Sequence, residues 1–376
     1  MGAGREETAV EIQQTIEQIC RLFRIEGDFL RAEQIKNGNI NQTYKVTFLI
    51  PEGYEKSFLV QRVNTYVFRQ PENLMDNADR VSEHIRAKNQ GRIALHYHHT
   101  SQRKTYAYDQ QGGFWRMSNY IPSVTYNASS DPAVLREAGA AFGAFQRDLA
   151  DFPADELYET IPDFHNTPKR LQALFDHVEE DPVGRVAQVR EELDYIARVR
   201  EKAERLTRLW EQGQLPLRVT HNDTKINNVL FDQQGKHAMV VIDLDTVMPG
   251  LVGHDFGDGV RFCTNVVEED CPDSERACCD LERFRAFAQG FLEQTGEALT
   301  PLERETLALS AFALTVELAA RFLDDYIMGD VYFKLNYPQH NLVRTRCQLA
   351  LARDMESKLE QMQAIVDACM QAQEKE

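Results

Sequence analysis

The sequence predicts an α+β protein with two lobes, a small β-rich N-terminal lobe (1–121) and a larger, mainly helical C-terminal lobe (122–376). Short segments that alternate in polarity dominate the chain before the polar stretch that contains Pro122, and long apolar patterns with helical spacing dominate after it. A chain of 376 residues is long enough for each lobe to bury a core of its own.

The N-terminal lobe is expected to begin with an amphipathic helix, because apolar residues recur at helical spacing over 8–25. Asn37-Gly38 marks a hairpin turn before an alternating strand. Together these signals predict a small sheet with one inserted helix: strands near 35, 44–49, 57–63, 93–98, 104–108 and 113–120, and a helix over 71–90.

The C-terminal lobe shows the period of buried or amphipathic helices in most of its length. A compact β-rich insert, 217–260, interrupts this pattern and carries most of the polar residues that could perform chemistry. The predicted helices cover 132–150, 186–211, 281–295, 302–328 and 340–370.

Charge and composition exclude some classes of partner. The formal net charge of −17 argues against a nucleic-acid or an anionic-membrane surface, since both require a positive field. We find neither a signal peptide nor a membrane-spanning run, so a cytoplasmic protein is expected. The seven cysteines are odd in number, and Cys271, Cys278 and Cys279 have the wrong spacing for a zinc site, which favours reduced thiols.

The most informative segment runs from Val219 to Phe231 and contains the pattern His-x-Asp-x-Lys-x-x-Asn. An apolar strand ending in Asp243 follows about twenty residues after Asp223. Phosphoryl transfer needs such a set: a carboxylate that takes the proton of the nucleophile, a cation, and oxygen ligands for Mg²⁺. The spacing therefore predicts Asp223 as the catalytic base, Lys225 as the cation that stabilises charge, and Asn228 and Asp243 as the metal ligands.

Each of these residues is weak evidence alone, because an Asp in a loop is most often a turn or cap residue. Their combination is much more specific. Asp255-Phe256-Gly257 spells a metal-binding motif of protein kinases, but it follows no apolar strand and begins a helical pattern. We therefore predict that Asp255 is structural, either capping that helix or holding the loop.

These motifs resemble the aminoglycoside phosphotransferase and choline-kinase-like superfamily, and most closely its N-acetylhexosamine 1-kinases. The resemblance covers about residues 35 to 350. It is carried by the segments 37–44, 61–64, 221–228, 241–250, 255–258, 329–334 and 340–342. It implies a protein-kinase-like fold and a kinase that uses ATP and Mg²⁺ to phosphorylate the anomeric hydroxyl of GlcNAc or GalNAc.

The same resemblance implies the contacts to the sugar substrate. Asp223 would bind the anomeric hydroxyl, and Arg321, Tyr332 and Asp245 would complete the acceptor site. From the residues alone two alternatives remain open: Arg321 forms a structural ion pair with Asp324 or Asp325, and Tyr332 is an interior tyrosine.

The nucleotide is expected to contact the N-terminal lobe. The loop from Asn37 through Asn39 and Asn41 to Thr43 would lie over the phosphates, although an ordinary β-turn explains its pattern equally well. Arg62 is the candidate for the basic residue that reaches the phosphates, with Glu83 as its partner or as a solvated helix residue. Backbone groups from Asn119 to Ile121 would contact adenine.

Two competing functions remain open. A kinase of the same fold could act on another sugar, choline, homoserine or an aminoglycoside, and the acidic composition permits a cationic acceptor. A nucleotide-binding pseudokinase is the alternative from a different class, and it predicts the loss of at least one catalytic polar group. The presence of Asp223, Lys225, Asn228 and Asp243 argues against it.

Overall fold

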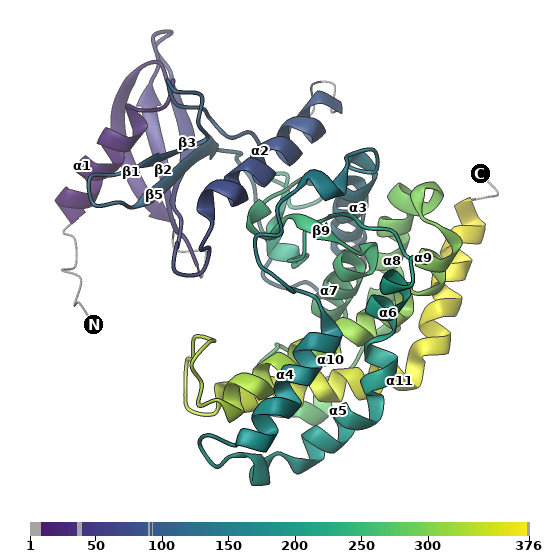
Figure 1. The fold of residues 1–376 in the computed structure, drawn as a ribbon. Coiled ribbons are helices and arrows are strands. Elements are labelled where there is room, and N and C mark those ends of the chain that lie inside the picture. Colours follow the sequence, from purple (N-terminus) through teal and green to yellow (C-terminus); the bar gives the residue numbers. More distant parts are fainter. Residues whose placement is uncertain (1–8, 36–39, 89–90, 92, 374–376) are drawn as a thin grey trace. The chain divides into compact units, whose positions relative to one another are not determined.

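The computed structural model of the protein describes residues 9–35, 40–88, 91 and 93–373. The chain divides into two compact units. The N-terminal unit comprises Met1–Pro122 and the short segment Leu244–Val247, and the C-terminal unit comprises Ser123–Asp243 and Met248–Glu376. A β-sheet dominates the first unit and helices dominate the second, so the predicted fold class is confirmed (Figure 1).

The N-terminal unit is built on one antiparallel five-stranded sheet with the strand order β1-β2-β3-β5-β4 (Figure 1). The predicted strand at 93–98 is wrong, since Tyr97 forms only an isolated bridge with Ser118. The elements are α1 Ala9–Cys20, β1 Asp28–Ile35, β2 Gln42–Leu49, β3 Glu55–Arg62, α2 Pro71–Lys88, β4 Tyr106–Tyr108, β5 Phe114–Asn119 and, from the distant segment, η4 Leu244–Thr246.

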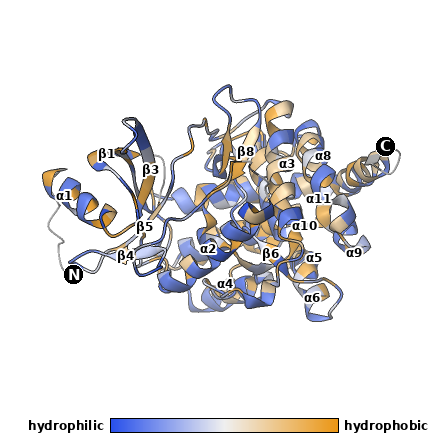
Figure 2. Cartoon of the chain, turned by 90° about the horizontal axis from the view of Figure 1, so that it is seen from above, coloured by the Kyte–Doolittle hydropathy of each residue, from blue (hydrophilic) through white to orange (hydrophobic). Residues whose placement is uncertain are grey.

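The period of two in the strands decides which face of this sheet is apolar. Val46, Val60 and Trp115 project from one face and are fully buried with Ile16 and Ile19 of α1. Figure 2 shows that α1 carries hydrophobic and hydrophilic residues together, as a helix does when only one side is buried. The opposite face of the sheet carries polar residues near the ends of β2, β3 and β5, and it is described with the site.

The C-terminal unit packs its helices around short two-stranded sheets. The segments 186–211 and 302–328, each predicted as one helix, are each divided into two α-helices. The helix over Thr167–Glu180 was not predicted. The elements are α3 Pro132–Asp148, η1 Ala154–Glu156, α4 Thr167–Glu180, η2 Val186–Gln188, α5 Arg190–Ala203, α6 Arg205–Glu211, β6 Arg218–Thr220, η3 Ile226–Asn228, β7 Val229–Phe231, β8 Ala238–Val241, β9 Met248–Gly250, α7 Val252–Thr264, η5 Ser274–Arg276, α8 Leu281–Thr295, η6 Gly296–Ala298, α9 Pro301–Glu305, α10 Leu307–Ile327 and α11 His340–Gln373.

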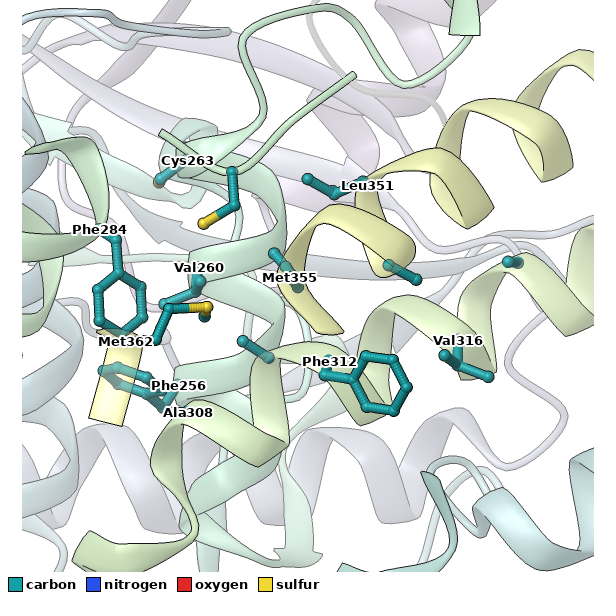
Figure 3. Close-up of a cluster of buried hydrophobic side chains, with 14 of the residues drawn as sticks. Phe256, Val260, Cys263, Phe284, Ala308, Phe312, Val316, Leu351, Met355 and Met362 are labelled. Carbon is teal, nitrogen blue, oxygen red and sulfur yellow. The ribbon is translucent and has the colours of Figure 1, made fainter. Parts of the chain in front are cut away.

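The core of the C-terminal unit lies among α7, α8, α10 and α11. Phe256, Phe284, Phe312 and Met355 from these four helices point toward one another and are inaccessible to solvent (Figure 3). A Phe→Ala change in such a core costs about 3–5 kcal/mol of folding free energy. The core therefore holds α7 rigidly in position. This helix carries Asp255 and Asp258, which are described with the site.

Helix termini are defined by side chains that accept hydrogen bonds from free backbone N–H groups. Asp131 caps α3, with Pro132 in the first turn, and Asp280 caps α8. Gly139 allows these two helices to approach closely, since a Cβ at this position would collide with the backbone of Phe287. Within the described residues, no helix is long and apolar enough to cross a membrane. All seven cysteines are free thiols.

Candidate active site

The loop between β6 and β7 brings the three polar residues predicted there into direct contact. The Nζ atom of Lys225 lies 2.9 Å from Oδ1 of Asp223. The amide nitrogen of Asn228 donates to Oδ2 of Asp223 at 3.1 Å and to its carbonyl oxygen at 2.8 Å. The Asp223 side chain keeps 28% of its surface exposed, so its carboxylate is held in place and is still accessible to a ligand.

The charges of this cluster are complementary. The nearby Asp223 carboxylate, opposed by burial, raises the pKa of Lys225, so the lysine stays protonated at neutral pH. A carboxylate with one fixed cation and one amide donor retains lone pairs for the hydroxyl of a ligand. The cluster can therefore accept a proton and stabilise negative charge in the same place.

Asp243 reaches the same hairpin from the next strand. The N–H of Ile242 donates to the carbonyl oxygen of Asn228 at 2.9 Å, which places the backbone before Asp243 beside Asn228. Asp243 is exposed and has a left-handed backbone with φ of 63°. Such a conformation costs a non-glycine residue about 1–3 kcal/mol and is often found at functional sites.

The donor set fits a magnesium ion. Because the nitrogen of the Asn228 amide faces Asp223, its oxygen Oδ1 is directed away and can act as a neutral ligand. Asp243 would supply the charged ligand. The described part of the chain has no group of three His, Cys, Asp or Glu residues that could enclose a metal. Mg²⁺ usually binds one or two carboxylates and takes its other ligands from phosphates and water, so Asn228 and Asp243 could hold it together with a nucleotide.

Asp255 of α7 holds the loop that contains Asp223 through hydrogen bonds to the loop backbone. Its carboxylate is fully buried and accepts the backbone N–H groups of His221 at 2.9 Å and Asn222 at 2.8 Å, and the side chain of Gln146 at 2.7 Å. Burial raises the pKa of Asp255, and these donors and His221 oppose the rise. Of the two structural roles predicted, the structure shows that Asp255 holds the loop.

A second aspartate of α7 was part of the sequence resemblance but had no predicted role. Asp258 accepts the backbone N–H of Thr224 at 2.9 Å and pairs with Arg261 at 2.8 Å. The three-residue spacing from Asp255 to Asp258 puts both carboxylates on one side of the helix, which the sequence could have indicated. Residues on both sides of Asp223 are thus fixed by a single helix.

In the N-terminal unit, strand pairing separates two residues that were predicted to bind one nucleotide. Thr43 lies opposite Gln61, and Gln61 opposite Arg116, so these three share one face of the sheet. Arg62 is the next residue along and projects from the other face, where it lies over the Trp115 ring at 5.8 Å. Arg62 therefore does not share the Thr43 face, and the arginine on that face is Arg116, which the sequence analysis did not single out.

Asp245 is not placed as a substrate contact would be. Its side chain is 5% exposed, its Oδ1 pairs with Arg116, and its Oδ2 accepts from the Asn41 amide at 2.7 Å. Both carboxylate oxygens are therefore engaged within the N-terminal unit, which argues against the predicted contact with a sugar. Asn41 is described, whereas the predicted contacts of Asn37 and Asn39 lie outside the described residues.

The other predicted nucleotide contacts are placed as follows. Asn119 and Tyr120 line a cavity of about 690 Å³, and Ile121 follows them as a buried residue. The N–H of Asn119 already donates to the carbonyl oxygen of His96 at 3.1 Å, so it is not available to adenine. Glu83 contacts His96 at 2.9 Å and also Arg86, and not the predicted partner Arg62.

Arg321 has a different environment from the predicted ion pair. Its guanidinium lies over the Phe164 ring at 5.3 Å and the Phe333 ring at 5.8 Å. Asp324 is bound to His177 at 2.6 Å, so it is not the partner of Arg321. Stacking between two aromatic rings orients a guanidinium while leaving its N–H groups available.

Asp325, the other proposed partner of Arg321, instead shapes the loop after α10. It is 4% exposed and accepts the backbone N–H groups of Val331, Tyr332 and Phe333 at 2.7 to 2.9 Å. Tyr332 is 69% exposed, so the alternative of an interior tyrosine is wrong. Its ring is therefore available to a ligand.

A second arginine beside Arg321 was not predicted. Nε and Nη2 of Arg170, on α4, each lie 3.4 Å from the carbonyl oxygen of Phe164, whose ring faces Arg321. Figure 1 shows α4 alongside α10. Burial and the neighbouring Arg321 lower the pKa of Arg170. Among the described residues, neither arginine lies within salt-bridge distance of a carboxylate. The sequence analysis missed this pair because it did not predict α4, the helix that carries Arg170.

His254 of α7 supplies a testable pH dependence. Burial, with a contribution from His165, lowers its pKa to about 3, although Glu317 opposes the shift. The ring nitrogen Nδ1 of His254 accepts the N–H of Leu251 at 3.3 Å. Below about pH 6.5 the His254 side chain takes up a proton in the unfolded chain but stays neutral in the native protein. The free energy of unfolding therefore falls as the pH drops from about 6.5 toward 3, by at most about 1.4 kcal/mol per pH unit.

We expect His254→Asn to reduce the difference between the unfolding free energies at pH 7 and pH 5, measured by urea denaturation, because asparagine can still accept the Leu251 N–H. His237→Asn is the control, since the side chain of His237 is 75% exposed. An unchanged pH dependence in His254→Asn would show that another group is responsible.

The fold and the Asp223 loop together define a phosphotransferase with a protein-kinase-like fold. Residues 31–323 match the phosphotransferase enzyme family APH, so the chain belongs to that family. The sequence resemblance to the superfamily is thereby confirmed, while the narrower N-acetylhexosamine 1-kinase assignment stays a prediction.

Solved structures agree on the fold at low sequence identity. An aminoglycoside phosphotransferase from Alicyclobacillus acidocaldarius is 12% identical, with a TM-score of 0.65 and coverage of 98% of this chain and 100% of that chain. A microcompartment-associated aminopropanol kinase is 14% identical, with a TM-score of 0.63 and coverage of 93% and 98%. A choline kinase from Cryptosporidium parvum is 14% identical, with a TM-score of 0.55 and coverage of 95% and 99%.

Proposed function

We propose that the protein is an ATP-dependent kinase that phosphorylates the anomeric hydroxyl of an N-acetylhexosamine. The observation that carries the kinase activity is the contact of Asp223 with Lys225 and Asn228, beside the segment that leads from β8 to Asp243. Family membership supports phosphoryl transfer, and two solved structures of the same fold, at 13% and 12% identity, contain ADP or AMP-PNP.

In this proposal Asn228 and Asp243 hold Mg²⁺, which neutralises charge on the phosphates when it is bound. Asp223 orients the anomeric hydroxyl and takes its proton. Lys225 stays protonated and stabilises the charge of the transferring phosphoryl group. Asn41 and Thr43 belong to the loop assigned to the phosphates.

The acceptor class is inferred from Arg170 and Arg321. A cavity of about 230 Å³ is lined by Asn222, which precedes Asp223, by Phe164, and by the acidic residues Glu159 and Asp163. Arg170 and Arg321 do not line it themselves and lie against Phe164. The two guanidinium groups favour an acceptor with hydroxyl and carbonyl oxygens, and their charge opposes an ammonium group beside them, whereas the two acidic residues would attract one. An N-acetylated sugar offers such oxygens without a charge, and exposed Tyr332 offers a ring for the sugar face.

The proposal is tested by measuring ADP release from Mg-ATP with a panel of acceptors: N-acetylglucosamine, N-acetylgalactosamine, glucose, galactose, choline, homoserine and kanamycin. We expect turnover with the two N-acetyl sugars at a kcat/KM at least about a hundredfold above that of the amines. Turnover with an amine instead would retain the kinase and refute the acceptor. Binding of Mg-ATP without turnover of any acceptor would favour a pseudokinase.

The role of the arginine pair is tested by Arg170→Met, which removes the charge and keeps most of the apolar stem. At about 7 Å and an effective dielectric constant of about 20, the repulsion of an ammonium group is about 2 kcal/mol. We therefore expect the preference for N-acetylglucosamine over glucosamine, as a ratio of kcat/KM values, to fall at least about tenfold. Arg198→Met is the matched control, because Arg198 is an exposed arginine paired with Glu356. An unchanged ratio in Arg170→Met would refute the role of the pair.

A further inference from the structure

A continuous hydrogen-bonded network in the N-terminal unit begins at Thr43, passes through Gln61, Arg116 and Asp245, and ends at Asn41. The amide nitrogen of Gln61 donates to the Thr43 hydroxyl at 3.1 Å, and Nε of Arg116 donates to Oε1 of Gln61 at 2.9 Å. Arg116 then pairs with Asp245, and Asn41 donates to the second carboxylate oxygen at 2.7 Å. The two ends of the network, Asn41 and Thr43, both lie where the chain enters β2.

The network is buried and its members are hydrogen-bonded. The side chains of Arg116 and Asp245 are 2% and 5% exposed. Arg116 also lies over the Tyr97 ring at 5.7 Å and within 3.8 Å of the Met75 sulfur. Loss of one partner from a buried ion pair leaves an uncompensated charge, so the pair holds its members firmly.

The network is connected to the proposed metal site because Asp245 lies close to Asp243 in the chain. Asp245 follows the predicted metal ligand Asp243 by two residues, and Leu244–Val247 belongs to the N-terminal unit although its neighbours on both sides do not. The far end of this segment is fixed as well, because Asn77 donates to the carbonyl oxygen of Val247 at 3.0 Å. The backbone that leaves Asp243 is thus anchored at two points.

We propose that the Arg116–Asp245 pair is a positioning device that fixes the start of β2, through Asn41, and the backbone that follows the proposed metal ligand Asp243. This inference rests on the proposed kinase function. Arg116 and Asp245 are positioning residues: they contact neither nucleotide nor metal, and act through Asn41 on one side and through the backbone next to Asp243 on the other. The 2% exposure of Arg116 argues against a direct contact with phosphate.

The decisive variant is Asp245→Asn, which keeps the shape of the side chain and removes its charge. Two measurements need no acceptor: the affinity for Mg-ADP by calorimetry, and hydrogen–deuterium exchange of a peptide over 41–49. We expect at least about tenfold weaker binding of Mg-ADP and faster exchange at the start of β2. Glu303→Gln is the matched control, because it breaks the buried pair of Glu303 with Arg218 in the C-terminal unit. The control should bind Mg-ADP within about twofold of the wild type.

If Asp245→Asn does not fold, Arg116→Lys decides, since lysine keeps the charge and cannot contact Gln61 and Asp245 together. We expect weaker Mg-ADP binding and faster exchange in that variant too. Wild-type affinity and exchange in a folded variant would overturn the proposal. Weaker binding of Mg-ADP with unchanged exchange would also overturn it, and would indicate that Arg116 contacts phosphate directly. A wild-type protein that binds Mg-ADP but phosphorylates no N-acetylhexosamine would refute the acceptor and leave this test intact.

Discussion

Replacement of Asp223 by Asn is expected to lower kcat by on the order of a thousandfold while the affinity for Mg-ADP changes little. General-base catalysis contributes about 10²- to 10⁴-fold, and asparagine cannot take the proton of the acceptor. The side chain keeps its size, so the contact with Asn228 can be retained. The measurement is single-turnover kinetics at saturating acceptor together with calorimetry of Mg-ADP binding.

Asp232→Asn is the matched control for this substitution. Asp232 follows β7 and accepts the backbone N–H groups of Gln234 and Lys236 in a turn, so it provides the same chemical change away from the catalytic cluster. We expect a kcat close to that of the wild type. Near-normal turnover in Asp223→Asn would show that another group accepts the proton, whereas loss of Mg-ADP binding would indicate that Asp223 is a metal ligand.

The second large effect separates Asp243 from Asp255. Asp243→Ala should destabilise the protein less than Asp255→Ala does, because Asp243 is exposed, and should abolish the dependence of nucleotide affinity on Mg²⁺. Asp255→Ala should instead lower the unfolding free energy by several kcal/mol. It leaves the buried N–H groups of His221 and Asn222 without an acceptor, at about 1–3 kcal/mol each.

Thermal unfolding and Mg-ADP calorimetry, each with and without Mg²⁺, distinguish these two variants. If Asp243→Ala has a mild effect on nucleotide binding and Asp255→Ala removes the response to Mg²⁺ without loss of stability, the metal ligand is Asp255. That result would also contradict the role of Asp255 in holding the loop that contains Asp223.

The catalytic loop was predictable because its residues are close in sequence. Asp223, Lys225 and Asn228 span six positions between two strands, and the local backbone alone brings them together. The structural role of Asp255 was also predictable, since an aspartate in the first turn of a helix and away from a strand end is suited to bind backbone N–H groups. These inferences needed no tertiary information.

The N-terminal unit shows where such reasoning fails. Choosing between Gln61 and Arg62 as the residue on the Thr43 face requires knowing which strand positions point to that face, because a shift of one residue reverses the face. The sequence signal favoured the charged residue, but Arg116 on the neighbouring strand occupies the Thr43 face. The sequence could not predict that Leu244–Val247 belongs to the N-terminal unit, because this assignment depends on contacts with residues more than a hundred positions away.

The proposed acceptor site contains residues that the sequence indicated and one residue that only the tertiary structure brings into the site. Arg321 and Tyr332 were proposed from a resemblance, and the structure shows that the aromatic rings of Phe164 and Phe333 orient Arg321. Arg170 escaped prediction because its helix was overlooked, although α4 is amphipathic, and because its partner in the pair lies 151 residues further along the chain, on α10. Only packing of α4 against α10 brings the two charges together.

The central claim is phosphorylation of an anomeric hydroxyl, and ³¹P NMR of the product formed from N-acetylglucosamine and Mg-ATP tests it most directly. We expect a single phosphomonoester whose phosphorus couples to the anomeric proton, and no such product with Asp223→Asn. A phosphate on any other hydroxyl, or transfer only to an amine-bearing acceptor, would contradict the account.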